Sequence, residues 1–246
     1  MVRNKPARWT VWMGLCVLTA SCLAGEKQVQ PALVPVPAGR FLMGGREADP
    51  PQEPREVEVT AFLMGRYEVT VEELAAWLND AAPPGRAGSP QIARRDDRFQ
   101  PVRGARRRPA AWVSFEDAQA YCRWRGDKSG RRVRLPTETE WEYAARGGIE
   151  GARFPWGWGA PEGRACFAGE APRAVGSYPP NGFGLYDMAG NVFEWCVSDE
   201  APGEAVARGG SWAERDPRFL RLYNRVKFPR TYRDADVGFR VVVEAE

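Results

Sequence analysis

The sequence predicts a single domain of the α+β class in which much of the backbone is irregular. Three segments begin with a capping pattern and continue with the spacing of an amphipathic helix, while two short runs alternate as β-strands do. There are 26 glycines and 21 prolines among the 246 residues, and ten tryptophans. This composition favours an interior of aromatic side chains between turns and loops rather than long repeating elements.

Each predicted helix starts at a Ser or Thr that is followed three residues later by an acidic residue. In such a capping box, the hydroxyl and the carboxylate each bond the backbone of the other residue. The pattern places helix starts at Thr70, Ser114 and Thr137, and Gly147 ends the third helix. The residues expected to face the core are Leu74, Trp77 and Leu78, then Phe115, Ala118 and Cys122, then Trp141, Ala144 and Ala145.

The alternating runs cover residues 57–64 and 238–243, and we expect them to pair an early and a late part of the chain. Residues 81–109 form a loop with eight arginines, including the consecutive Arg106 to Arg108. We interpret this loop as a solvated, mobile insertion. The alternative is a surface that contacts phosphates of lipid or lipopolysaccharide, because arginine clusters bind phosphate bidentately.

The absence of histidine excludes several kinds of active site. Without imidazole there is no Ser-His-Asp triad, no Cys-His pair and no His-ligated zinc or iron. The 35 basic and 32 acidic side chains nearly balance, so a nucleic-acid partner is not expected. Any chemistry would have to use carboxylates, Cys, Tyr, Lys, Arg or a cofactor.

The amino terminus has the order of an export signal. Arg3, Lys5 and Arg8 precede an uncharged apolar run, residues 11–20, that is too short to span a membrane. The run ends in small residues before Cys22, which resembles a bacterial lipoprotein signal. Residues 1–21 are therefore expected to be the signal peptide, residues 22–33 a tether and residues 34–246 the domain. Ordinary secretion is the alternative.

On this prediction Cys22 is lipidated, and the domain is anchored at the periplasmic face of the cell envelope. Leu23 is compatible with sorting to the outer membrane. Three cysteines then remain in an oxidising compartment, and three thiols cannot all pair. We expect Cys122 to be buried and inert, while a bridge between Cys166 and Cys196 is left open.

Seven motifs occur in an order that resembles one known family. They are Val36-Pro-Ala-Gly-Arg-Phe-Leu-Met-Gly44, Tyr67-Glu-Val-Thr70, the stretch from Arg134 to Gly148, Phe154-Pro-Trp-Gly157, the stretch from Asn181 to Trp195, Arg208-Gly-Gly-Ser-Trp212 and Gly238-Phe-Arg240. Together they resemble the formylglycine-generating enzymes, also called the sulfatase-modifying factor family. The resemblance implies a single domain with a C-type-lectin-like fold, and it covers residues 34–243.

The resemblance also implies copper chemistry that these residues do not support. Formylglycine-generating enzymes oxidise a substrate cysteine with oxygen and a copper ion held by two cysteines. The matching positions here are Glu214 and Phe219. A carboxylate and a phenyl ring do not supply the soft thiolates that Cu(I) prefers, so copper is not expected. The family's iron-dependent branch needs histidines and is excluded. A branch that resembles the exported oxidase of pyoverdine maturation lacks the cysteine pair and stays open.

The resemblance further implies a structural calcium ion. The matching residues are Asp187, Gly190, Val192 and Glu194, which would offer two carboxylates and two carbonyls to a hard cation. The alternative is that the two carboxylates cap turns or pair with arginine. A second calcium site of the family is expected to be lost, because Ala165 stands where an Asn is expected and the acidic loop is shortened to residues 169–172.

Ser211, Trp212, Glu214 and Arg221 are the candidate residues of a functional cleft. Without histidine, Ser211 has no evident base, whereas Glu214 could act as a base if burial raised its pKa; the simpler reading is a carboxylate paired with arginine. The leading hypothesis is an exported binding or scaffold module, a pseudoenzyme without copper, whose partner is an exported protein or peptide. The alternative is a cysteine-independent oxidase or other protein-modifying enzyme that acts on an exported sulfatase-like or peptide substrate.

Overall fold

The structure is a computed structural model that describes residues 32–48, 51–81, 89–198, 201 and 204–245. The predicted signal peptide, Cys22 and nearly all of the tether lie outside the described residues, so export and lipid anchoring stay predictions. Within the described ranges, no helix is both long enough and apolar enough to cross a membrane.

The three helices begin where the capping boxes predicted. They are α1 (Val71–Ala81), α2 (Phe115–Ser129) and α3 (Glu138–Arg146). At the start of α1, the carboxylate of Glu73 accepts hydrogen bonds from the backbone N–H of Thr70 at 2.8 Å and from its hydroxyl at 2.7 Å. Complete capping boxes also begin α2 and α3, and Gly147 ends α3 in the left-handed conformation with φ of 57°. The helix predictions are confirmed.

The described strands form two four-stranded sheets and two two-stranded ribbons. The first sheet has the order β1 (Leu33–Val36), β4 (Phe62–Gly65), β12 (Val242–Glu244) and β7 (Val133–Arg134). The second has the order β10 (Arg225–Lys227), β9 (Ala205–Arg208), β8 (Phe193–Val197) and β11 (Val237–Gly238). The ribbons pair β2 (Gly39–Gly45) with β3 (Gln52–Val59), and β5 (Ile92–Arg95) with β6 (Arg98–Pro101).

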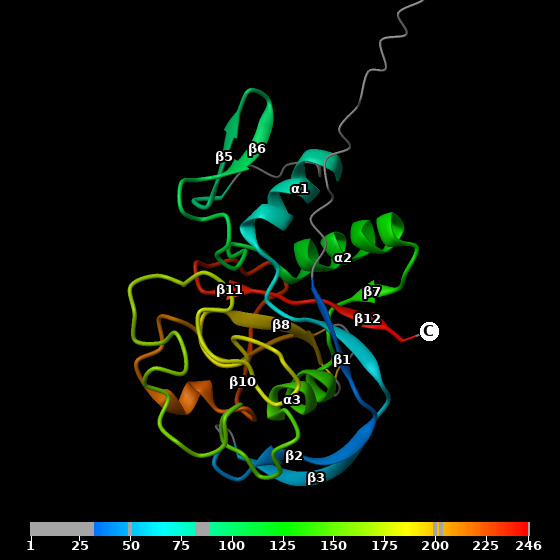
Figure 1. Cartoon of the computed structure of the whole chain (residues 1–246), viewed down its shortest axis with the longest axis vertical. Helices are drawn as coiled ribbons and strands as arrows, with labels where there is room; N and C mark the ends of the chain where they lie inside the picture. The colour runs from blue at the N-terminus through cyan, green and yellow to red at the C-terminus, as the bar shows by residue number, and fades with distance from the viewer. Residues whose placement is uncertain (1–31, 49–50, 82–88, 199–200, 202–203, 246) are drawn as a thin grey trace, which may run out of the picture.

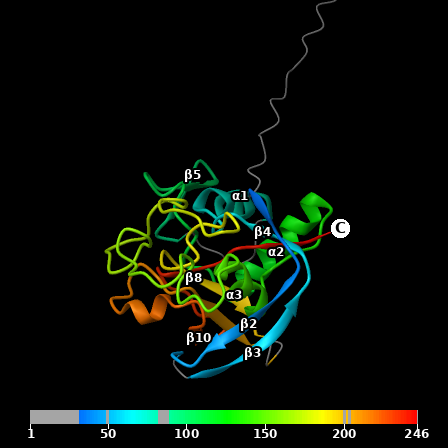
Figure 2. The ribbon, with the colours of Figure 1, turned by 60° about the horizontal axis from the view of Figure 1, so that its bottom comes forward.

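The elements are arranged around the sheets as Figure 1 shows. Helices α1 and α2 lie together at one end, and α3 lies between the sheets and the β2–β3 ribbon. Turned by 60°, the β2–β3 ribbon comes to the front of the molecule (Figure 2). Between α3 and β8, the fully described stretch 147–192 has turns and isolated bridges but no helix or strand, as the glycine and proline content predicted.

Both predicted strand runs are broken in the structure. Residues 57–64 divide between β3 and β4, which belong to different sheets, because the chain turns at residues 60–61. Residues 238–243 divide between β11 and β12 in the same way. The expected pairing of early and late segments is confirmed, since Val242 of β12 lies opposite Met64 of β4 in antiparallel register.

The arginine-rich segment is more ordered than predicted, since its described part contains the β5–β6 hairpin. Asp96 and Asp97 form the turn with φ of 48° and 59°, a backbone conformation that Asp tolerates better than most residues. The side-chain amide of Asn79 in α1 fixes the hairpin by bonding both the N–H of Phe99 at 2.7 Å and its carbonyl at 2.9 Å. A role in phosphate contact stays untested.

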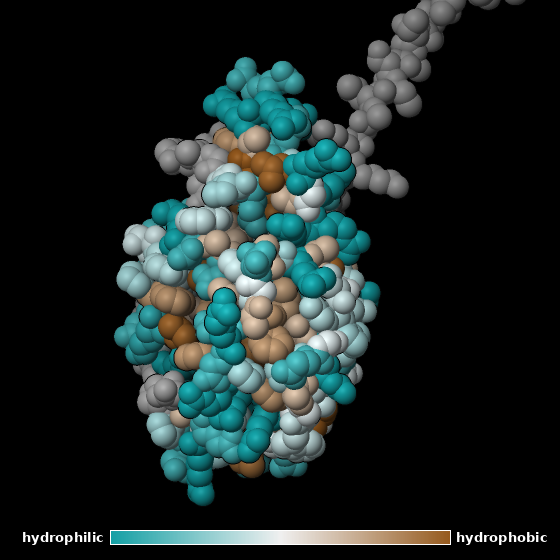
Figure 3. Space-filling model, turned by 90° about the vertical axis from the view of Figure 1, so that its left-hand side faces the viewer, coloured by the Kyte–Doolittle hydropathy of each residue, from teal (hydrophilic) through white to brown (hydrophobic). Residues whose placement is uncertain are grey.

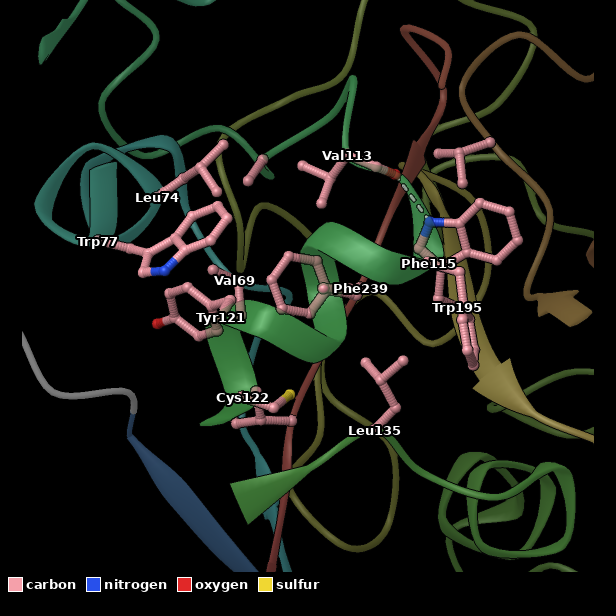
Figure 4. Packing of buried hydrophobic residues seen from close by; sticks show 14 of the residues in the cluster. Val69, Leu74, Trp77, Val113, Phe115, Tyr121, Cys122, Leu135, Trp195 and Phe239 are labelled. Carbon is pink, nitrogen blue, oxygen red and sulfur yellow. Dashed lines mark hydrogen bonds between the residues drawn. The ribbon is translucent and has the colours of Figure 1, made fainter. Parts of the chain in front are cut away.

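Aromatic side chains fill the main core, as the tryptophan content predicted (Figure 4). Tyr121 of α2 lies edge-on to Trp77 of α1 and to Phe239, with ring centroids 6.1 Å and 5.2 Å apart. The indole N–H of Trp195 donates to the carbonyl of Val113 at 2.8 Å, so its polar atom is satisfied inside the core. Residues from α1, α2, β8 and the C-terminal segment thus form one hydrophobic cluster.

Candidate functional site

Two glycines set the position of the candidate cleft residues. Gly209 and Gly210 follow β9 with φ of 94° and 73°. A Cβ atom at Gly210 would lie 2.6 Å from Cδ2 of Leu220, so only glycine fits this turn. The turn then directs Ser211 inward and carries Trp212 beside residues 167–169, where the N–H of Gly169 donates to the Trp212 carbonyl at 2.8 Å.

Ser211 is fully buried, and its hydroxyl lies 3.2 Å from Oδ2 of Asp236. The sequence analysis found no base for this serine, so this carboxylate is a partner that it missed. Burial raises the pKa of Asp236, and the charge of Asp234 raises it further. Because the serine side chain has no exposed surface, the pair links the turn to the segment before β11 rather than presenting a nucleophile to solvent.

Glu214 is partly exposed, as are Trp212 and Arg221. Partial burial raises its pKa, and the charges of Asp236 and Asp216 raise it further. The expected pairing of Glu214 with arginine is not what the structure has: Arg218 pairs instead with Asp216 at 2.6 Å. Three carboxylates close together make Glu214 a better proton acceptor near neutral pH than an isolated glutamate would be.

Arg221 does not join the other three candidates. It follows η1 (Pro217–Leu220), and its guanidinium donates to the carbonyl of Glu47 at 3.0 Å and pairs with the Glu47 carboxylate at 3.2 Å. It lines a pocket of about 500 Å³ that is also bordered by Phe219 and not by Ser211, Trp212 or Glu214. The predicted cleft therefore divides into an acidic side around Glu214 and an arginine-lined pocket.

Glu214 and Phe219, which match the copper cysteines, lie on different sides of the predicted cleft. Glu214 lies on the acidic side, and Phe219 is 39% exposed in η1 at the wall of the pocket. Neither side chain supplies a thiolate, so the donor set does not fit a copper ion. The three cysteines of the domain that the structure describes, Cys122, Cys166 and Cys196, are all buried, and none of them forms a disulfide with another. The bridge that the sequence left open is thus not present.

The carboxylate of Glu194, a predicted calcium ligand, is held by an arginine. Its Oε1 and Oε2 accept hydrogen bonds from Arg240 at 2.6 Å each, and Oε2 also accepts one from Trp141 at 2.7 Å. All three side chains are buried. The pairing with arginine is the alternative that the sequence analysis gave for this carboxylate, and the calcium assignment stays a prediction.

Asp187, by contrast, faces a second carboxyl group. Its φ is 57°, and its Oδ2 accepts a hydrogen bond from Gly176 at 2.7 Å. Burial raises the pKa of Asp187 to about 6, although the hydrogen bond from Gly176 opposes the shift. Burial also raises the pKa of Glu68, and the charge of the neighbouring Asp187 adds to it. Two buried carboxyls at such close range favour either a shared proton or a bound cation.

Glu68 is a buried acidic residue close to Asp187 that the sequence analysis did not single out. Its Oε1 accepts a hydrogen bond from Asn191 at 3.0 Å, whereas its buried Oε2 has no donor among the described residues. With Asp187 it fits a hard cation better than Glu194 does. The available signal was an acidic residue between Tyr67 and Val69 in a motif that was already noted.

The main-chain positions of the predicted calcium site belong to a tight turn. The N–H of Gly190 donates to the carbonyl of Gly209 at 2.8 Å, and Val192 is fully buried directly before β8. Among the described residues, no group of three or more His, Cys, Asp or Glu side chains is arranged to hold a metal ion. A cation at this place would therefore rest on Asp187 and Glu68 together with main-chain oxygens.

Comparison with known proteins agrees with the fold. The model of the sulfatase-modifying factor enzyme 1-like domain matches residues 20–245. In an alignment of 241 residues, which covers 75% of each chain, this protein is 34% identical to the inactive C-alpha-formylglycine-generating enzyme 2 of Mus musculus. It is 32% identical to the formylglycine-generating enzyme of Thermomonospora curvata over 227 residues, 70% of this chain and 72% of that one. PvdO from Pseudomonas aeruginosa is 30% identical with a TM-score of 0.73, over 87% of this chain and 95% of that one.

Proposed function

The chain belongs to the sulfatase-modifying factor family of formylglycine-generating enzymes, and on that premise we propose that it is a binding or scaffold module without copper chemistry. One observation carries the proposal: the positions that match the copper cysteines are Glu214 and Phe219, and they lie on two different sides of the former cleft. The similarity to a relative that is itself named inactive supports the same reading.

The test is formylglycine formation on a sulfatase-type cysteine peptide. The purified chain is incubated with the peptide, Cu(I) and oxygen, and the product is measured by mass spectrometry beside an active formylglycine-generating enzyme. We expect formylglycine only with the active enzyme. Copper-dependent product from the wild-type chain would contradict the proposal. The variant with Glu214→Cys and Phe219→Cys shows whether the missing thiolates alone account for the lack of product.

A second candidate function is a copper-independent modifying enzyme, such as an oxidase that acts on an exported sulfatase-like or peptide substrate. The observation that favours it is the raised pKa of Glu214, which partial burial and the charges of Asp236 and Asp216 produce. A base of this kind would remove a proton from a bound substrate near neutral pH. Substrate-dependent oxygen uptake that is lost in Glu214→Gln and retained in Asp97→Asn, a change at the hairpin turn, would favour the enzyme over the binding module.

The proposal includes calcium as a structural ion and export through a lipid on Cys22. Asp187 and Glu68 would hold the calcium, which would satisfy the unpaired Oε2 of Glu68 and neutralise two buried charges. We expect EDTA to lower the melting temperature of the purified domain and added Ca²⁺ to restore it. The same transition in EDTA and in Ca²⁺ would contradict the calcium role. Metabolic labelling with a palmitate analogue, compared between the wild type and Cys22→Ser, tests the anchor.

A further inference from the structure

The pocket that Arg221 lines has charged side chains that take no part in the predicted copper or calcium sites. It holds about 500 Å³ and is lined by Glu47, Arg153, Arg218, Phe219, Arg221 and Asn224 among others; we call it the arginine pocket. Three segments meet there: the turn between β2 and β3, the loop after α3, and η1 with the residues after it. They converge at the lower left in both ribbon views (Figures 1 and 2).

The arginine pocket already contains one carboxylate, which the protein itself supplies. The Glu47 carboxylate pairs with Arg153 at 2.5 Å and Arg221 at 3.2 Å, and the hydroxyl of Tyr223 lies 3.3 Å from it. The Glu47 side chain is 45% exposed. Desolvation by itself would raise the pKa of Glu47. The hydrogen bond from Arg153 and the charges of Arg153 and Arg221 outweigh it, so the pKa is lowered. Glu47 reaches the pocket from an exposed turn, and its contacts show that the guanidiniums of the pocket bind a carboxylate.

The pocket also has an acceptor that lacks a donor. Asn224 is 8% exposed, its amide nitrogen donates to the carbonyl of Arg218, and its Oδ1 is buried with no hydrogen-bond partner in the described structure. A buried carbonyl oxygen without a donor is costly and rare in folded proteins. Asn224 thus lies at the pocket wall with its oxygen buried, and the groups that the pocket offers to a ligand are its guanidiniums.

We infer that the arginine pocket binds an acidic segment of an exported peptide or protein, whose carboxylate takes the place of Glu47. This inference rests on the proposed binding function and names its ligand class. The 39% exposed ring of Phe219 at the pocket wall gives the same peptide an apolar contact.

The surface around this side of the molecule agrees with a small polar site rather than a broad apolar interface. Figure 3 shows hydrophobic residues in separate patches among hydrophilic ones. The large hydrophobic side chains that are exposed in the described chain are Leu42, Trp158 and Phe219. A charged recognition site of this kind gains specificity from geometry, because a guanidinium binds a carboxylate through two parallel hydrogen bonds.

The experiment measures fluorescence anisotropy of a labelled eight-residue peptide of alternating Gly and Glu as the purified chain is added. The matched peptide carries Gln in place of Glu. We expect the Glu peptide to bind at least tenfold more tightly than the Gln peptide, and its affinity to fall as salt is raised.

Three variants locate the binding. Arg153→Gln and Arg221→Gln should each weaken the Glu peptide about tenfold, since each removes one charge-assisted contact. Glu47→Gln should tighten it several-fold, because it removes the internal competitor; a gain in affinity cannot result from misfolding. Arg132→Gln is the control, because Arg132 is an exposed arginine that pairs with Glu244 at the edge of the first sheet.

Equal binding of the Glu and Gln peptides would overturn the inference, and so would unchanged affinity in Glu47→Gln. Inorganic phosphate that displaces the peptide at equal concentration would reduce the pocket to a simple anion site and would also overturn the peptide assignment. None of these results bears on the copper assay, so the inference and the proposed function fail separately.

Discussion

The buried ion pair between Arg240 and Glu194 offers the sharpest test of how this fold is held together. Arg240 has no exposed surface, makes two 2.6 Å contacts with Glu194, and donates to the carbonyls of Gly65 at 3.0 Å and Tyr186 at 2.9 Å. It thus connects the C-terminal segment to β4, to β8 and to the loop before β8. The change to test is Arg240→Met, which keeps the apolar stem and removes the charge.

The expected loss of stability in Arg240→Met is large because the buried Glu194 carboxylate is left without a cation. Glu194 stays buried, and the nearby carboxyls of Glu68 and Asp187 lose the same cation, since Arg240 lowers the pKa of both. Removing one member of a buried pair costs about 3–5 kcal/mol. For a domain of this size, that corresponds to a melting temperature lower by roughly 6–20 °C. Arg40→Met, which breaks an exposed pair with Glu58, should cost less than about 1 kcal/mol.

Urea unfolding followed by circular dichroism measures these differences. The double variant with Glu194→Gln and Arg240→Met should regain part of the stability that Arg240→Met loses, because Glu194 is then no longer a buried charge without its partner. Lowering the pH should also narrow the gap between Arg240→Met and the wild type, since the carboxyls then become neutral. A loss below about 1 kcal/mol in Arg240→Met, or strictly additive losses in the double variant, would refute the reasoning.

Three further predictions concern the calcium turn and the cysteines. Because burial raises the pKa of Asp187 to about 6, this carboxyl holds its proton more tightly in the folded state than in the unfolded chain. Its contribution to the unfolding free energy in EDTA should be fully present below pH ~4 and be lost, by up to about 3 kcal/mol, as the pH rises through 6. Asp187→Asn should flatten this slope, and a slope unchanged in that variant would contradict the assignment. Gly190→Ala should lower the free energy of unfolding in urea by about 2 kcal/mol or more, because its Cβ would lie 2.3 Å from the Cys166 carbonyl oxygen at a φ of 76°. Gly151→Ala is the control, since its φ is 66° and no atom lies within 4 Å of its Cβ, and it should cost clearly less. Equal losses in the two variants would rule out the steric argument. The three cysteines of the domain should react with a thiol reagent only after unfolding, and an unchanged melting temperature in dithiothreitol checks that none is bridged.

The candidate site could be predicted from the sequence only in part. The motif order identified the Arg208–Trp212 turn and the loss of the copper thiolates, because those depend on residue identity alone. The division of the cleft could not be predicted, since Arg221 takes its partner Glu47 from a turn 174 residues earlier in the chain. Glu68 was missed for the same reason: its neighbour Asp187 lies in a distant loop.

The sequence by itself determined the helices of this protein, because a capping box is an interaction between residues three apart. Thr70, Ser114 and Thr137 therefore begin helices as predicted. Only the tertiary structure decided which charges pair inside the molecule. Buried carboxylates and guanidiniums take whichever partner the fold brings within hydrogen-bond distance, so Glu194 pairs with Arg240 from 46 residues away, while Glu68 and Asp187 face each other.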